Sequence, residues 1–156
     1  MVIMKEAEKF AKKVFGGKYK GIDLKLNMLH CKSVLKCCLA LSKGMNVDIA
    51  SLKTAAWLHD IGRVESKEAH AAKSVEMAEK EFGNLDFTIK DCILNHGSSE
   101  NPETTEGRIF QLADKMSIML PEAFIFHARQ DRDEALKFLK KIIEKFLVLA
   151  EKFDFK

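Results

Sequence analysis

The sequence predicts an all-α protein, folded as a single-domain helical bundle over residues 1–156. Only two Pro and eight Gly occur in the 156 residues, and residues that favour helices dominate the chain. Apolar residues recur at the three- and four-residue spacing of a helix face. The length is that of one ordinary domain, and no internal repeat, low-complexity segment or linker divides it.

Glycines and capping residues divide the chain into predicted helices, and these signals are clearest in its first half. The predicted helices cover 4–15, 24–42, 49–60, 67–82, 87–95, 105–120 and 131–153. The pair Gly16-Gly17 would stop the first helix, and Gly44 follows the second. Asp48 is a good N-cap for the third helix, which is apolar enough to be central, and Ser66 would cap the fourth.

The second half of the chain is divided by a polar loop and a proline. Residues 98–104 are polar and contain Pro102, so they predict a loop after the fifth helix. The sixth helix would end before Pro121, and Asp131 would open the last helix after a short stretch at 124–127. An apolar stripe on the last helix is expected in the core, although it could form a homodimer seam. Its residues are Leu136, Leu139, Ile143, Phe146, Leu147 and Ala150.

Charge and hydropathy limit the classes of partner. The net charge of +3 is a mild basic excess, which does not by itself indicate nucleic-acid binding. No apolar run approaches the roughly 20 residues that cross a bilayer. Residues 1–6 become charged at once and lack the apolar core of a signal peptide. We therefore expect a cytoplasmic protein without a membrane partner.

The four cysteines do not predict a structural zinc site. Cys31, Cys37, Cys38 and Cys92 form no C-x-x-C pair. Their apolar neighbours predict buried, reduced thiols. Cys31 follows His30 and could be a metal ligand, but adjacent helical residues point about 100° apart, which does not favour it.

The doublet His59-Asp60 is the most informative feature of the chain. It belongs to an ordered series of His and Asp residues on different predicted helices or at helix ends: His30, His59, Asp60, His70, His96 and Asp114. Rigid elements that carry N and O donors suit a divalent cation. Asp114 lies in an apolar stretch, where a buried carboxylate is costly unless it is paired, hydrogen-bonded or bound to metal.

Each of these residues also has an ordinary structural explanation. A lone His on an apolar helix is more often a packed core residue than a ligand, and Asp114 could pair with Arg108 or Lys115. His127 lies outside the ordered series and is predicted to be structural. Trp57 is predicted to belong to the core. The metal site is therefore a hypothesis about the whole set.

The set His30, His59-Asp60 and Asp114 on successive helices resembles the HD-domain metal-dependent phosphohydrolase superfamily, which is named for its His-Asp doublet. The resemblance spans about residues 27–119. It implies an all-α bundle of the HD-domain type in which these four residues bind one divalent metal.

His70 and His96 are similar to the extra His positions of two-metal members of this superfamily. By that resemblance Asp60 would bridge two ions, and His70 and His96 would hold the second. The alternative is one ion, with these two His acting as acid, base or phosphate contacts. The donor set suits Mn, Fe, Co, Ni, Zn or Mg.

The resemblance implies a phosphomonoesterase or phosphodiesterase that acts on a small phosphoester, such as a nucleotide or nucleotide derivative, by metal-activated hydroxide. Phosphate chemistry needs further positive charge. Arg63 is the first candidate, Lys115 the second and Arg108 the third, and each could instead be a solvated or paired surface cation. The predicted catalytic residues are Asp60, Arg63 and Lys115. The loop 97–101 could contact substrate.

Two other functions use the same fold. A di-iron oxygenase of the HD fold would hold two irons at the same six positions. A non-catalytic HD-fold binding module would use metal only structurally. We expect a small phosphorylated substrate as partner and leave a homodimer open.

Overall fold

The computed structural model describes residues 2–153, so residue 1 and residues 154–156 of the predicted domain lie outside the described residues. Within the described range the chain is helical, without strands, which confirms the all-α prediction. The elements are α1 (Val2–Lys18), α2 (Gly21–Leu41), α3 (Ile49–Leu58), the 3₁₀ helix η1 (Ile61–Val64), α4 (His70–Phe82), α5 (Phe87–Leu94), α6 (Thr105–Ser117), α7 (Pro121–Gln130) and α8 (Arg132–Phe153).

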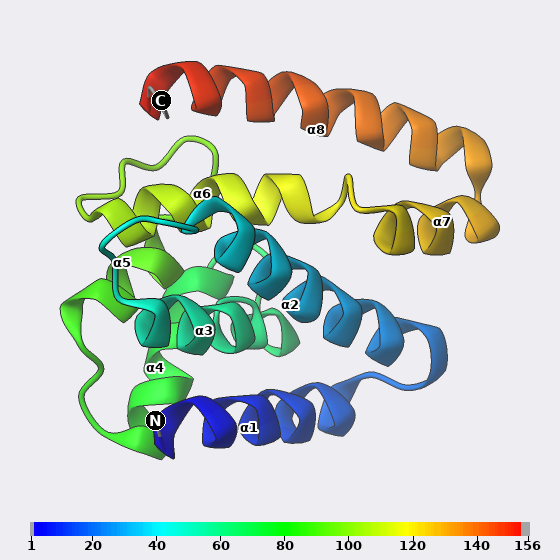
Figure 1. The fold of residues 1–156 in the computed structure, drawn as a ribbon. Helices are drawn as coiled ribbons and strands as arrows, with labels where there is room; N and C mark the ends of the chain where they lie inside the picture. Colours follow the sequence, from blue (N-terminus) through cyan, green and yellow to red (C-terminus); the bar gives the residue numbers. More distant parts are fainter. Residues whose placement is uncertain (1, 154–156) are drawn as a thin grey trace.

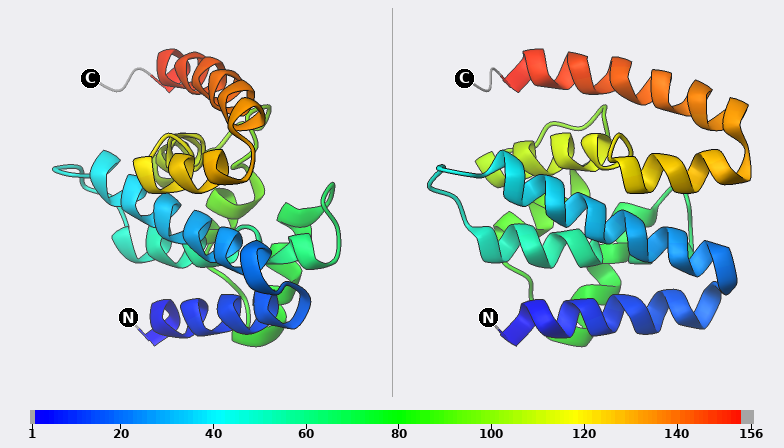
Figure 2. Two further views of the ribbon diagram at one scale, coloured as in Figure 1. Left: turned by 90° about the vertical axis from the view of Figure 1, so that its right-hand side faces the viewer. Right: turned by 45° about the vertical axis from the view of Figure 1, so that its right-hand side comes forward.

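The helices pack around a core that α3 traverses. α1 and α8 lie on opposite outer sides, with α2, α3 and α6 between them (Figures 1 and 2). α2 packs on α3 and α6, and α3 also packs on α1 and α5. Leu52 and Leu58 of α3 are fully buried, and Trp57 belongs to the core as predicted. The end of α3 therefore lies deep in the molecule.

The start of α3 is fixed by Asp48, as predicted. Its side-chain Oδ1 accepts hydrogen bonds from the backbone N–H groups of Ala50 at 2.9 Å and Ser51 at 3.1 Å. These bonds satisfy donors that a helix start otherwise leaves without partners. The helix ends at Leu58, so the doublet His59-Asp60 occupies the turn between α3 and η1.

The prediction that Gly16-Gly17 stops the first helix is wrong, because α1 continues to Lys18. Each glycine costs a helix about 1 kcal/mol relative to alanine. Packing of the fully buried Phe15 on the core outweighs that cost. The break comes instead at residues 19–20, before Gly21, the first residue of α2, whose φ of 55° lies in the left-handed region.

Three other local predictions are corrected. α4 begins at His70 rather than 67, because Ser66 Oγ accepts from the backbone N–H of Ala69 and so closes a preceding turn. The 3₁₀ helix after the doublet was not predicted. The stretch at 124–127 belongs to a full helix, α7, in which Pro121 takes the first position, where proline is favoured.

The prediction that the apolar stripe of the last helix lies in the core is wrong. Of its six residues Leu136, Ile143 and Leu147 are exposed and the other three are half-buried, whereas the neighbouring Ala135, Ile142 and Leu149 are buried. α8 packs on α6 and α7, so only one narrow stripe of its apolar surface is covered. A homodimer through the exposed residues stays a prediction.

Two further predictions concern the cysteine thiols and membrane-spanning helices. The four cysteines are buried free thiols, and burial raises the pKa of the Cys38 thiol far above its usual value. None of the helices in residues 2–153 combines the length and apolar character that a membrane span requires.

Candidate metal centre

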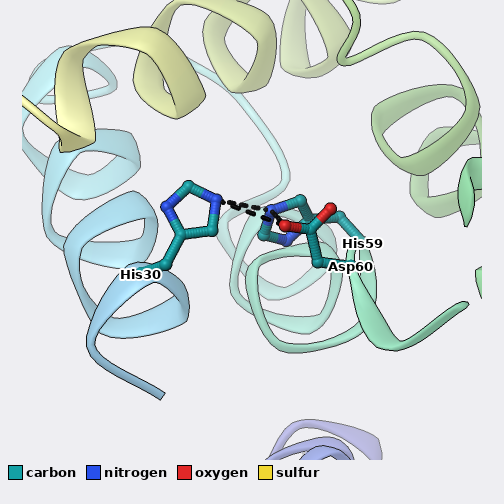
Figure 3. A group of neighbouring side chains, drawn as sticks. All are labelled: His30, His59 and Asp60. Carbon is teal, nitrogen blue, oxygen red and sulfur yellow. Dashed lines mark hydrogen bonds and ion pairs between the residues drawn. The ribbon is translucent and has the colours of Figure 1, made fainter. Parts of the chain in front are cut away.

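Six side chains from five helical elements converge next to the end of α3. They are His30 on α2, His59 and Asp60 after α3, His70 at the first position of α4, His96 after α5 and Asp114 on α6. Figure 3 shows His30 pointing from α2 toward the doublet. The structure thus brings together the whole ordered series that the sequence predicted.

The carboxylate of Asp60 lies between two pairs of imidazoles. Its Oδ2 is 3.5 Å from Nε2 of both His30 and His59. Its Oδ1 is 3.4 Å from Nε2 of His70 and 3.7 Å from Nε2 of His96. Each oxygen faces one pair, so Asp60 belongs to both groups of possible metal ligands.

Asp114 joins the first of these pairs. Its Oδ1 lies 3.1 Å from His30 Nε2 and 3.7 Å from His59 Nε2. Its other oxygen, Oδ2, accepts a hydrogen bond from Lys115 Nζ at 2.5 Å. The side chain of Lys115 is only 14% exposed. Lys115 therefore neutralises Asp114 in this structure.

Three of the imidazoles are oriented by the same local contact. Nδ1 of His59, His70 and His96 faces the backbone carbonyl three residues earlier, at 3.2, 2.7 and 2.6 Å. A carbonyl can only accept, so Nδ1 carries the proton and donates. The Nε2 lone pair then points into the cluster, as it does in metal-binding histidines.

His30 is oriented by a residue that sequence reasoning missed. The Oγ of Ser117 donates to the carbonyl of Asp114 at 2.7 Å and lies 3.3 Å from His30 Nδ1. Because its proton is already used, this hydroxyl accepts from Nδ1. His30 Nε2 therefore also points toward the cluster.

The donor geometry fits a divalent cation. His70 Nε2 and His96 Nε2 are 3.0 Å apart, and the corresponding atoms of His30 and His59 are 3.1 Å apart. Ligand atoms about 2.1 Å from an ion and at right angles are about 3.0 Å from each other. Nε2 of His70 and Nε2 of His96 both carry lone pairs, because both rings are protonated at Nδ1. A cation between these two atoms removes the repulsion between the lone pairs.

A buried oxygen of Asp60 gives independent support. Oδ1 accepts no hydrogen bond from any residue in the described chain. Arg63 Nε lies 2.9 Å away as an ion pair, but not in hydrogen-bonding alignment. A buried polar atom without a hydrogen bond is costly unless it binds an ion. The cluster can thus hold metal in two groups that share Asp60.

The charges of the cluster are those of metal ligands. Burial lowers the pKa of His59 to about 3, so its ring is neutral at pH 7. Burial works against ionisation of Asp60, but His59, His30 and Arg63 outweigh it and hold the carboxyl pKa well below its usual value. Neutral imidazole and ionised carboxylate are the forms that bind cations.

His30 behaves differently from His59. Burial works to lower its pKa, but the hydrogen bond with Asp114 and the charges of both carboxylates outweigh burial and raise it. A proton on His30 Nε2 therefore competes with a cation for the first group.

Two unpredicted features bring His70 beside Asp60. Ser74 Oγ donates to the carbonyl of His59 at 2.7 Å and accepts from the backbone N–H of Gly62 at 2.8 Å. A Cβ at Gly62 would overlap backbone atoms of His70 and Ser74. Gly62 is thus required for the close approach of η1 and α4.

The loop after His96 is held by buried polar side chains. Gln111 Nε2 lies within hydrogen-bonding distance of the carbonyls of Asn95, Gly97 and Glu100, which share its two protons. Asp91 accepts from the backbone N–H and the hydroxyl of Thr104. Sequence reasoning missed both residues. A signal for Gln111 was its position between Phe110 and Leu112 in an apolar stretch.

A cavity of about 230 Å³ opens beside the cluster. Its lining comprises His30, Asp60, Arg63, Leu26, Asn27, Leu29, Ile118, Ala123, His127 and Phe138. Arg63 is 45% exposed there, so its guanidinium is accessible to a ligand. His127, predicted to be structural, lies in the cavity wall. Arg108 lines a different cavity, with Asn101 and Lys152.

Comparison with known proteins gives a family match and curated relatives. A family model described as HD domain matches residues 28–119, more than half of the chain. Ribonuclease Y of Malacoplasma penetrans is 29% identical over 122 residues, which are 76% of this chain and 25% of that protein. For Ribonuclease Y of Treponema pallidum the identity is 30% over 130 residues, or 81% and 24%.

A further relative has higher identity over a shorter stretch. Ribonuclease Y of Fervidobacterium nodosum is 36% identical over 109 residues, which are 68% of this chain and 20% of that protein. The chain spans about a quarter or less of the length of these relatives. No solved structure matches it significantly.

Proposed function

The chain belongs to the HD domain family of metal-dependent phosphohydrolases, and from this premise we propose that it hydrolyses a small phosphoester, a nucleotide or nucleotide derivative. The observation that carries the proposal is the carboxylate of Asp60, which faces an imidazole pair with each of its oxygens.

We assign the metal ligands in two groups. His30, His59, Asp60 and Asp114 would hold a first divalent ion, and His70 and His96 would hold a second together with Asp60. The ions would be Mn, Fe, Co, Ni, Zn or Mg. When bound, they would supply Lewis acidity and lower the pKa of a water molecule so that hydroxide is available near pH 7.

The surrounding side chains would position the phosphoryl group. Arg63 lies at the mouth of the cavity and pairs with Asp60. Its guanidinium can donate two parallel hydrogen bonds to phosphate oxygens, and would stabilise the charge that develops on them. Lys115 would act through Asp114, whose charge it offsets, rather than by contact with substrate.

The names of the relatives favour a second candidate, hydrolysis of phosphodiester bonds in RNA. The cavity that adjoins the cluster, of about 230 Å³, supports the first candidate because it is a site for a small ligand. The end of an RNA strand would compete for the same cavity, so the screen below decides between the candidates.

The test is a screen of the protein, reconstituted with each metal, against nucleoside mono-, di- and triphosphates, non-aromatic phosphoesters and short RNA oligonucleotides. Turnover that requires metal and is lost in Asp60→Ala supports the proposal, and the substrate class decides between the candidates. Activity that survives Asp60→Ala contradicts the mechanism.

Two control measurements address the other functions. Iron analysis and spectroscopy after anaerobic purification would reveal an oxygen-reactive di-iron centre and favour an oxygenase. Bound metal without turnover of any phosphoester would favour a binding module.

A further inference from the structure

The cavity beside the metal cluster is lined by both polar and apolar side chains. Its lining includes His30 and Asp60 of the cluster and Arg63, which pairs with Asp60. Apolar side chains provide most of the remaining wall: Leu26, Leu29, Ile118, Ala123 and Phe138. A ligand that fills this cavity with its phosphate at the metals therefore also contacts apolar side chains.

Part of that wall comes from outside the matched family segment. Ala123 and His127 belong to α7 and Phe138 to α8, whereas the family match ends at residue 119. α7 continues in the direction of α6, and α8 returns over both (Figure 1). The ligand series lies wholly before this hairpin, so the wall can vary independently of the metal cluster.

The two rings of the hairpin are placed to receive a flat group. Phe138 is 42% exposed although it lines a cavity. Its ring centroid lies 6.3 Å from that of His127, at 50° between the planes, so the rings do not stack on each other. An accessible aromatic face favours stacking with a nucleobase, because every base offers a π-face.

Polar groups beside the rings can bind the edges of such a ligand. Burial lowers the pKa of His127 below its usual value, and the charge of His30 lowers it further. A neutral imidazole offers one donor and one acceptor. Asn27 donates to the carbonyl of Asp23 at 2.8 Å, which leaves its side-chain oxygen available to accept.

We propose that His127 and Phe138 form a leaving-group subsite that binds the base of a nucleotide, so that the substrate is a nucleoside phosphate rather than a non-aromatic phosphoester. The hydrolysis of the bound nucleotide, as distinct from its binding, rests on the proposed function. Water adds to phosphorus, the P–O bond to the nucleoside side breaks, and the proton goes to the leaving oxygen.

The experiment compares Phe138→Leu, which keeps an apolar side chain but removes the π-face, with the matched control Leu147→Ala on the outer side of the same helix. Leu147 is 54% exposed and lines no part of this cavity. The measured quantity is the ratio of kcat/KM for the adenosine, guanosine, cytidine and uridine 5′-monophosphates to kcat/KM for glycerol 3-phosphate.

We expect Phe138→Leu to lower this ratio about tenfold for the preferred nucleotide, since loss of one stacking contact has about that effect. His127→Ala should lower it as well, and Leu147→Ala should not. A ratio that is the same in Phe138→Leu and the unsubstituted chain overturns the inference, as does an equal fall with Leu147→Ala.

Calorimetric binding of the same four nucleotides separates this inference from the proposed function. If the metal-loaded chain hydrolyses none of the phosphoesters, the proposed function fails. Binding that weakens about tenfold in Phe138→Leu would then still support the subsite. Binding that is equal in Phe138→Leu and Leu147→Ala, or no binding, overturns it.

Discussion

Substitution His70→Ala should remove the second metal ion and leave the first. The second group has three side chains, Asp60, His70 and His96, whose donor atoms lie within 4.8 Å of one another. The variant keeps one imidazole and a carboxylate oxygen. Loss of an outer partner of a metal ligand already costs about 10–100-fold in affinity. Loss of a ligand itself should cost at least about 100-fold, or about 2.7 kcal/mol.

The assay is the metal content of the purified chain after reconstitution with Mn and removal of excess ion. We expect two ions per unsubstituted chain and one per His70→Ala chain. The matched control is His127→Ala, since His127 belongs to neither donor group and its removal should leave the content at two. Two tightly held ions in His70→Ala would refute the assignment of the second group.

The remaining predictions concern the fold that positions the centre. Gly62→Ala should destabilise the chain by about 1–3 kcal/mol in denaturant unfolding, because the added Cβ overlaps the backbone of His70. The control Gly17→Ala meets no atom within 4 Å and should stabilise it by about 0.5–1 kcal/mol. Equal effects of the two would contradict the close approach at η1. Asp48→Ala should cost about 1 kcal/mol, because α3 loses its N-cap. The hydrogen bond from Ser51 lowers the pKa of Asp48, so this stabilisation is present above the unfolded-state pKa and is lost as the pH falls through the lower folded-state pKa. The difference between the unsubstituted chain and Asp48→Ala in unfolding free energy should therefore shrink at acid pH, and a constant difference would contradict it.

Four of the six residues of the candidate centre were predictable as neighbours of helix ends. His59 and Asp60 follow an apolar helix with a clear N-cap, His70 begins α4 and His96 follows α5. His30 and Asp114 lie inside α2 and α6, and they were grouped with the doublet through the resemblance to the HD-domain family. What could not be predicted was which oxygen of Asp60 faces which imidazole pair. That depends on the turn after α3, whose 3₁₀ geometry follows from contact between Gly62 and α4.

The last two helices show where helical periodicity does not predict which residues are buried. α8 carries apolar residues at both 135 and 136, and again at 142 and 143, so two adjacent stripes fit a helical spacing equally well. Packing on α6 decides which stripe is buried. His127 was predicted to be structural because it lies outside the ordered His and Asp series. The sequence does not show that α7 brings it to the same cavity as His30.

The contact between an imidazole and the carbonyl three residues earlier, found in His59, His70 and His96, makes each ligand self-aligned within its own segment. The helix end that carries each imidazole therefore sets the orientation of its ring. Substitutions at distant helix interfaces should thus alter ion affinity by changing the spacing between segments. The orientation of each imidazole relative to its own segment should stay the same.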